Sequence, residues 1–136
     1  HHEAALAALD MRQAYRRMVL ARAFDRRLAR VAPPMFVPSG GDEAIIAAVL
    51  AQLKDDDTLC PSQRDHALGY LRGIEIEECL RQILQRSPTA AQLFSGTGTS
   101  SLAHAIFPPL ESIGMSLALA AGAAQAHRLA RSSRVA

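Results

Sequence analysis

The residues best suited to chemistry follow a short apolar stretch near the middle of the chain. The segment Pro61 to His66, with the sequence PSQRDH, comes directly after Leu59 and Cys60. This order is typical of a buried strand that ends at a turn before a helix. An arginine at such a turn can hold an anion, because the free N–H groups of a helix N-terminus also attract negative charge. Arg64 therefore predicts a site for a phosphate-like group.

Two histidines are candidates for catalysis. His66 is the better general acid or base, because imidazole titrates near neutral pH and the adjacent Asp65 can tune it. A histidine in the first turn of a helix is more often structural, and that alternative stays open. His104 follows a polar loop and could reach a substrate as the loop closes; otherwise it is an ordered surface residue. The sequence contains no phosphate-binding P-loop motif, no local Ser/His/Asp arrangement and no zinc-ligand cluster.

The composition favours one small domain in a reducing compartment. The chain has 136 residues and a net charge of +2, with Lys54 as its one lysine. Such a small excess of positive charge does not indicate nucleic-acid binding. Cys60 and Cys79 are too far apart for a C-x-x-C motif, so two buried thiols are expected. No stretch approaches the roughly 20 apolar residues of a membrane span. We therefore expect a cytoplasmic protein without nucleic-acid or membrane partners.

Helices must position these residues. Apolar residues recur at helical spacing over 3–31, 45–53, 65–71, 75–86 and 113–131. Ser39 or Asp42 can cap the second of these helices. Residues 58–60 predict a short strand, 35–37 a short extended piece and 87–111 a loop region. The fold class expected is α/β and predominantly helical, with one or two short strands, in a single domain over residues 1–136.

The last predicted helix carries a face of small residues. These are Gly114, Ala118, Ala121, Gly122 and Ala126. Small residues let another helix approach closely, so self-association through residues 113–131 is one expectation. An ordinary internal packing seam is the alternative.

Four stretches together resemble a known family. Residues 15–25, 35–44, 61–66 and 71–73 are similar, in order and spacing, to the alpha subunit of the thiamin-diphosphate-dependent first component of 2-oxo acid dehydrogenase complexes. The branched-chain, pyruvate and acetoin types are the nearest in pattern. Residues 110–126 resemble the alanine- and glycine-rich helix that follows in those subunits. The resemblance covers nearly the whole chain and implies the N-terminal portion of a thiamin-diphosphate-binding fold.

The resemblance also implies roles for individual residues. In the family, a Tyr-Arg pair contacts the diphosphate; Arg64 matches the arginine, and Gln63 replaces the tyrosine. A Ser-Pro-Leu segment places its leucine near the aminopyrimidine ring of the cofactor. Leu110 matches that leucine, whereas Pro108 occupies the serine position. Gln63, Arg64 and Leu110 are therefore the implied cofactor-binding residues.

Magnesium and other subunits complete the implied assembly. The family holds magnesium through a Gly-Asp-Gly segment and a later asparagine, and this chain ends at Ala136 before any such segment. The resemblance implies two alpha and two beta subunits that decarboxylate a 2-oxo acid oxidatively and pass the acyl group to a lipoyl-bearing acyltransferase. This chain alone is not expected to be active. The alternative is a shortened, non-catalytic relative that acts as a subunit-association module, an interpretation motivated by Gln63, Pro108 and the missing metal segment.

Overall fold

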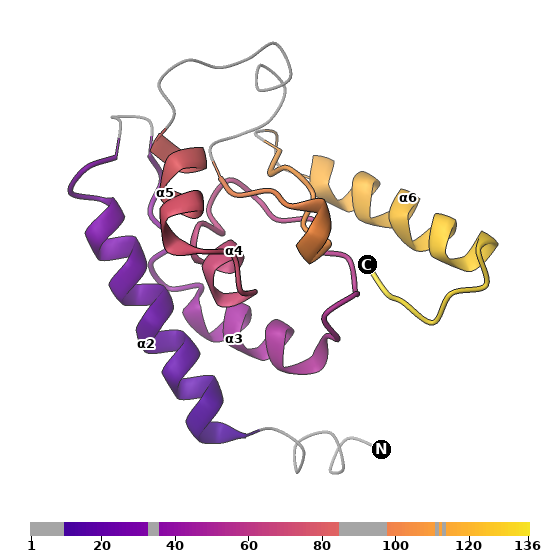
Figure 1. Cartoon of the computed structure of the whole chain (residues 1–136), viewed down its shortest axis with the longest axis horizontal. Helices are drawn as coiled ribbons and strands as arrows, with labels where there is room; N and C mark the ends of the chain where they lie inside the picture. The colour runs from indigo at the N-terminus through magenta and orange to yellow at the C-terminus, as the bar shows by residue number, and fades with distance from the viewer. Residues whose placement is uncertain (1–9, 33–35, 85–97, 111, 113) are drawn as a thin grey trace.

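The helices of this chain form one group, with a last helix standing apart from it (Figure 1). The structure, a computed structural model, describes residues 10–32, 36–84, 98–110, 112 and 114–136. The helices are α2 (Met11–Leu28), α3 (Glu43–Gln52), α4 (Ala67–Leu71), α5 (Ile76–Leu84), the 3₁₀-helix η2 (Leu102–His104) and α6 (Met115–Leu129). The predominantly helical class is confirmed. Residues 1–9, predicted in part as helix, and 87–97 and 111 of the predicted loop lie outside the described residues.

The first described helix begins at a side-chain cap. The carboxylate of Asp10 accepts hydrogen bonds from the backbone N–H groups of Arg12 and Gln13, at 2.9 and 3.2 Å. This satisfies two of the donors that a helix N-terminus leaves free. Positions at helical spacing turn inward, and Phe24 stacks on the Tyr70 ring of α4, with the centroids 5.8 Å apart. The predicted helix over 3–31 is thus confirmed for Met11–Leu28. It is not continuous through Asp10, which is extended and caps the helix, and it ends before residues 29–31.

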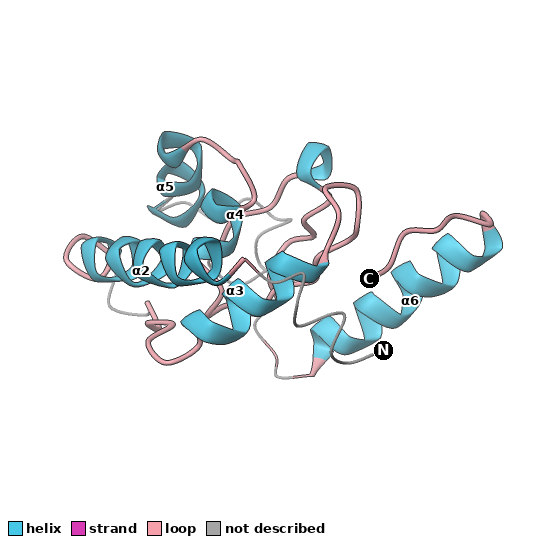
Figure 2. Ribbon diagram, turned by 90° about the horizontal axis from the view of Figure 1, so that it is seen from below, coloured by secondary structure: helices cyan, strands magenta, loops and turns pink. Residues whose placement is uncertain are grey.

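A single core lies between α2, α3, α4 and α5. Figure 2 shows α3 on one side of α2, and α4 and α5 on the other. The buried cluster combines these helices with the segments around residues 59 and 106, and it comprises Ala21, Phe24, Leu28, Ile46, Leu50, Leu59, Ala67, Leu68, Ile74, Cys79, Ile83 and Ile106. Cys79 is buried as predicted, whereas Cys60 is only partly buried.

The expected strands are reduced to isolated bridges in the described part of the chain. Leu59 pairs with Ile106, and Ser62 with Leu110, both in parallel, while Ser101 pairs with Ile106 in an antiparallel sense. The N–H of Leu59 donates to the carbonyl of Ala105 at 2.8 Å, and that of Phe107 to the carbonyl of Leu59 at 2.9 Å. Proline has no N–H to continue such a ladder. Pro61 on one side and residues 108–109 on the other therefore interrupt it between the two parallel bridges.

Helix α6 is held at its C-terminal end. The Oγ1 of Thr58 and the Nε2 of His127 lie 2.8 Å apart, and beyond the helix Val135 donates its N–H to Asp57 at 2.9 Å. Along α6 itself only Ala123 is buried. Figure 2 accordingly shows the helix standing away from the group formed by α2 to α5.

Within the parts of the chain that the structure describes, no helix is both long and apolar enough to cross a bilayer.

Gly69 in α4 allows the segment that contains Thr99 to pack closely. A Cβ atom built at Gly69 would lie 2.7 Å from Cγ2 of Thr99, whose side chain is itself buried. We therefore expect Gly69→Ala to lower the free energy of unfolding by roughly 1–3 kcal/mol through overpacking. Denaturant unfolding followed by circular dichroism measures this.

The matched control is Gly122→Ala in α6, where nothing lies within 4 Å of the built Cβ. Because alanine is the better helix former, this change should stabilise the chain by roughly 0.5–1 kcal/mol. Equal effects of the two substitutions would contradict the proposed close contact at Gly69.

Candidate functional site

The turn from Pro61 to His66 is closed by its own side chains. Asp65 accepts hydrogen bonds from the N–H and the Oγ–H of Ser62, at 2.7 and 2.8 Å. The N–H of Arg64 donates to Ser62 Oγ at 3.2 Å. These bonds fix the backbone on both sides of Arg64. Asp65 therefore acts first as the residue that closes the turn.

Arg64 extends from this turn toward solvent. Its guanidinium lies 3.4 Å from the carboxylate of Asp42, and both side chains are substantially exposed. An exposed pair of this kind contributes little to stability, so the arginine can exchange its partner for another anion at small cost. The predicted support from a helix N-terminus is weak, because α4 has only five residues and its first residue comes three positions after Arg64.

His66 lies in the interior, with 1% of its surface exposed. Its Nε2–H donates to the carbonyl of Val37 at 3.1 Å, and its ring packs on Phe36 with the centroids 4.5 Å apart. Burial lowers the pKa of His66, so the imidazole is neutral at physiological pH. Its Nδ1 is buried without a hydrogen-bond partner among the described residues. The arrangement joins the segment around Val37 to α4, and a catalytic role for His66 stays a prediction.

A second set of bonds fixes the loop that leads into α3. The N–H and Oγ–H of Ser39 both donate to a carboxylate oxygen of Asp25 in α2, at 3.1 and 3.0 Å, and both residues are buried. Ser39 is therefore not the cap of α3, which was one of two expectations. Asp42 occupies the N-cap position, but its side chain makes no capping bond.

Glu43, the first residue of α3, connects that loop to α2. Its carboxylate accepts a bond from Arg22 Nε at 2.9 Å and one from the N–H of Gly41 at 3.1 Å. The bond from Arg22 lowers the pKa of Glu43 to about 2. Residues 37–43 are thus attached to α2 through two carboxylates and to the start of α4 through His66.

The structure brings three of the five predicted site residues to one place. Ser62 pairs with Leu110, and Gln63 and Arg64 are the next two residues of the chain after Ser62. His104 lies at the other end of this pairing, two residues before the Ile106 that pairs with Leu59. The Nδ1 of His104 and the Oγ of Ser101 are 2.9 Å apart. Gln63, Arg64 and Leu110 therefore form a common edge, which His104 does not join.

A small hollow opens beside this edge, between α3 and residues 59–61. Its volume is about 170 Å³, and Asp65 is the one charged residue among those that line it, which are Ile45, Ile46, Val49, Leu59, Cys60, Pro61, Asp65 and Leu68. Sites for small molecules usually measure about 300–1,000 Å³. The hollow can accept part of a ligand, and other surfaces would have to enclose the rest.

Among the described residues, no group of three or more histidine, cysteine, aspartate or glutamate side chains is arranged to hold a metal ion. Asp65 in the turn and Glu43 at the end of the loop are engaged in the hydrogen bonds described above.

Comparison with known proteins gives no significant match. The chain matches no protein-family model, and no curated protein or solved structure is significantly similar to it.

The contacts that the sequence analysis missed are long-range ones. Arg22 belongs to a series with Arg26 and Arg30 that predicts a solvated face or, alternatively, an edge that binds an anion or a partner. Asp25 is an acid in the same polar stretch. Nothing in the local pattern indicates that Arg22 binds Glu43 or that Asp25 is buried against Ser39. The Gly41-Asp42-Glu43 sequence offers one signal, since an acid after a glycine turn can bind the turn's own N–H groups.

Removal of Arg22 should change how stability depends on pH. The folded-state pKa of Glu43 is lowered from 4.5 to about 2, so its contribution is fully present above pH 4.5 and is lost as the pH falls through about 2. In Arg22→Gln the pKa of Glu43 rises toward 4.5, and the decline of stability between these pH values becomes shallower. Urea unfolding at a series of pH values measures the slope.

Arg12→Gln is the control for that experiment, because Arg12 is exposed on the same helix and forms no ion pair among the described residues. Its slope should equal that of the unmodified chain. If Arg22→Gln also leaves the slope unchanged, the pair does not set the pKa of Glu43.

Proposed function

We propose that this chain forms the alpha-subunit side of a thiamin-diphosphate site in the first component of a 2-oxo acid dehydrogenase complex. The observation that carries the proposal is the parallel pairing of Ser62 with Leu110. It brings together two stretches, distant in sequence, that the family resemblance independently relates to one cofactor.

The residues present fit the diphosphate and part of the ring system. Arg64 has an exposed guanidinium on a turn that is fixed by Ser62 and Asp65, and a guanidinium binds phosphate oxygens through charge-assisted hydrogen bonds. Gln63 can donate a further bond from its amide. Leu110 and the apolar hollow beside residues 59–61 offer a surface for a flat ring.

Bound thiamin diphosphate would supply the carbanion-stabilising chemistry that decarboxylation of a 2-oxo acid requires. The chain's own contribution is to bind and orient. The fixed turn holds Arg64, and the buried bonds of Ser39 and His66 hold the adjacent loop. Magnesium would take its ligands from outside the described residues. A beta subunit would enclose the cofactor, and a lipoyl-bearing acyltransferase would accept the acyl group.

The proposal predicts opposite effects at the two members of the Arg64–Asp42 pair. Arg64→Ala removes a donor to the diphosphate, so it should weaken thiamin diphosphate binding by about ten- to a hundredfold. Asp42→Asn removes a competing carboxylate and should strengthen binding severalfold. Titration calorimetry with thiamin diphosphate and magnesium, on the chain mixed with a candidate beta subunit, measures both.

The matched control is Arg81→Ala, because Arg81 is similarly exposed and its acidic partner, Glu78, lies on its own helix. It should leave binding unchanged. Equal affinities for Arg64→Ala and Arg81→Ala would contradict the placement of the diphosphate at the turn.

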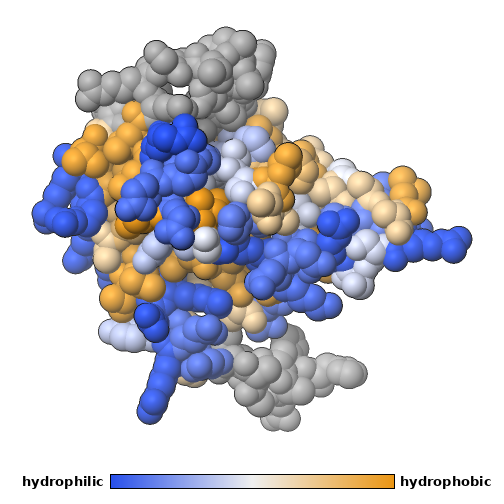
Figure 3. Space-filling view, in the orientation of Figure 1, coloured by the Kyte–Doolittle hydropathy of each residue, from blue (hydrophilic) through white to orange (hydrophobic). Residues whose placement is uncertain are grey.

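The exposure of α6 favours a second candidate function, that of a subunit-association module. Leu117 and Leu129 are 74% and 76% exposed, and Met115 is about half exposed. The stripe formed by Ala118, Gly122 and Ala126 is also exposed. Figure 3 shows apolar side chains at the surface along α6, on the right of the molecule. An exposed apolar helix with a small-residue stripe fits against a second helix, so we propose self-association through residues 113–131.

A pair of identical substitutions tests this surface. Ala118→Glu places a charge on the stripe, where association would bury it without a partner, so the dissociation constant of the oligomer should rise at least about tenfold. Ala124→Glu places the same charge on a different face of α6 and should have little effect. Sedimentation equilibrium measures both constants. A monomeric unmodified chain, or equal effects of the two variants, would exclude association through this stripe.

A further inference from the structure

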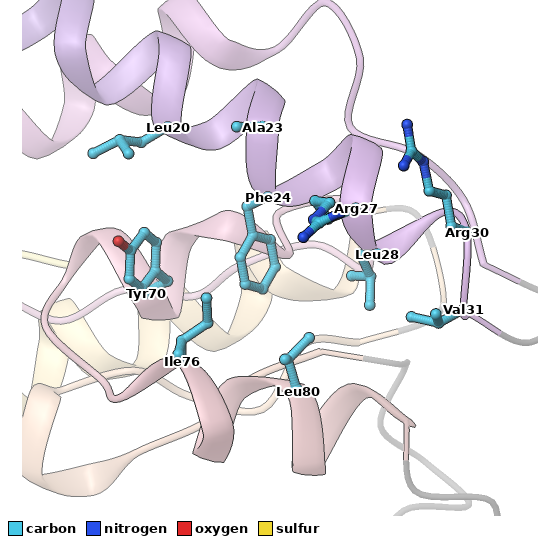
Figure 4. Close-up of a pocket in the computed structure, with 10 residues that line it drawn as sticks. All are labelled: Leu20, Ala23, Phe24, Arg27, Leu28, Arg30, Val31, Tyr70, Ile76 and Leu80. Carbon is cyan, nitrogen blue, oxygen red and sulfur yellow. The ribbon is translucent and has the colours of Figure 1, made fainter.

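A groove separate from the turn lies between α2, α4 and α5. Its volume is about 510 Å³, and Figure 4 shows the side chains that form it. Most are apolar: Leu20, Ala23, Phe24, Leu28, Val31, Tyr70, Ile76 and Leu80. This volume lies within the range usual for small-molecule sites, and so does the predominance of apolar and aromatic lining. The groove shares no lining residue with the hollow beside the turn.

Positive charge is confined to one end of this groove. Arg27 and Arg30 line it at the C-terminal end of α2, whereas Leu20 and Tyr70 lie at the opposite end (Figure 4). No acidic residue is among the described residues that line it. A ligand that fits this distribution has one anionic end and an apolar body.

Within the described residues, neither arginine of the groove is paired with a carboxylate. Arg22, Arg64 and Arg81 each form an ion pair with a nearby carboxylate. Arg27 and Arg30 form no ion pair within the described residues, although both are exposed. Of the acids at the start of α5, Glu78 binds Arg81 and Gln82. Within the described residues, Glu75 and Glu77 form no ion pair with Arg27 or Arg30. Anion-binding capacity therefore stays available at this end of the groove.

From these observations we infer that the groove binds a straight-chain aliphatic carboxylate. Helix α2 rises about 1.5 Å per residue, so Leu20 to Leu28 spans about 12 Å, and Arg30 follows just beyond the end of the helix. This length is enough for an extended acid of about ten carbons. The carboxylate lies at Arg27 and Arg30, where a guanidinium can bind both oxygens. The alkyl chain lies over Phe24 and between Ile76 and Leu80. This site is independent of the proposed cofactor half-site.

Decanoate is the probe, titrated into the purified chain by calorimetry below its micelle concentration. Decylamine, with the same chain and the opposite charge, is the ligand control. Decanoate should bind with a stoichiometry of one, and decylamine at least about tenfold more weakly, because its charge meets the two arginines. Absence of decanoate binding, or equal affinities for the two compounds, would overturn the inference.

Two sets of variants locate the site. Arg27→Gln with Arg30→Gln keeps every apolar contact of the groove and should weaken decanoate binding at least about tenfold. Arg12→Gln with Arg16→Gln removes the same charge from exposed positions of α2 outside the groove, and it should leave the affinity unchanged. Equal weakening by both pairs would show that only the net charge matters and would overturn the proposed site.

Ala23→Phe tests the apolar part of the groove. Ala23 is exposed and lines the groove, so the larger ring fills the space without removing a core contact. Decanoate binding should be lost while the circular dichroism spectrum stays unchanged. Unaltered binding in a folded Ala23→Phe variant would place the ligand elsewhere and contradict the proposal.

Discussion

The buried carboxylate of Asp25 is the constraint on which the rest of the site depends. It accepts two hydrogen bonds from Ser39 and so joins the C-terminal part of α2 to the loop before α3. A buried carboxylate is unfavourable without such partners, so helix and loop are each stable in this position only in the presence of the other. His66 adds the third attachment through the carbonyl of Val37. With the loop fixed in this way, Asp42 is held where it meets Arg64.

The periodic spacing of apolar residues predicts helices, but it does not reveal contacts between residues that are distant in the chain. The apolar spacing of α5 and α6 placed each helix to within a few residues, whereas α2 begins at Met11 rather than at Glu3, because Asp10 caps it. Gly73 follows the end of α4 with a positive φ of 103°. The strand predicted over 58–60 is reduced to an isolated bridge at Leu59, because prolines in two separate segments interrupt the pairing. The bond between Asp25 and Ser39 joins residues 14 positions apart, and no local pattern encodes it.

The same distinction applies to the candidate site. The residue types of the turn indicated an anion site at Arg64, and the structure shows this arginine exposed on a turn that is closed by Ser62 and Asp65. His66 was selected for its chemistry, yet its position is decided by packing against Phe36, which sequence spacing does not reveal. Among the arginines of α2, composition treats all members alike. Only the fold distinguishes Arg22, which binds Glu43, from Arg27 and from Arg30 just after the helix, which line one end of an apolar groove.

The distribution of exposed apolar surface argues for partners. Helix α6 buries little besides Ala123, and a helix in water gains most of its stability from packing rather than from intrinsic propensity. The hollow beside Arg64 is smaller than a typical ligand site, and its wall along α3 includes the exposed Ile45 and Val49. A second chain that covered α3 at this edge would both bury those side chains and deepen the hollow. The physical requirement to cover apolar surface and the chemical requirement to enclose a cofactor would then be met by the same contact.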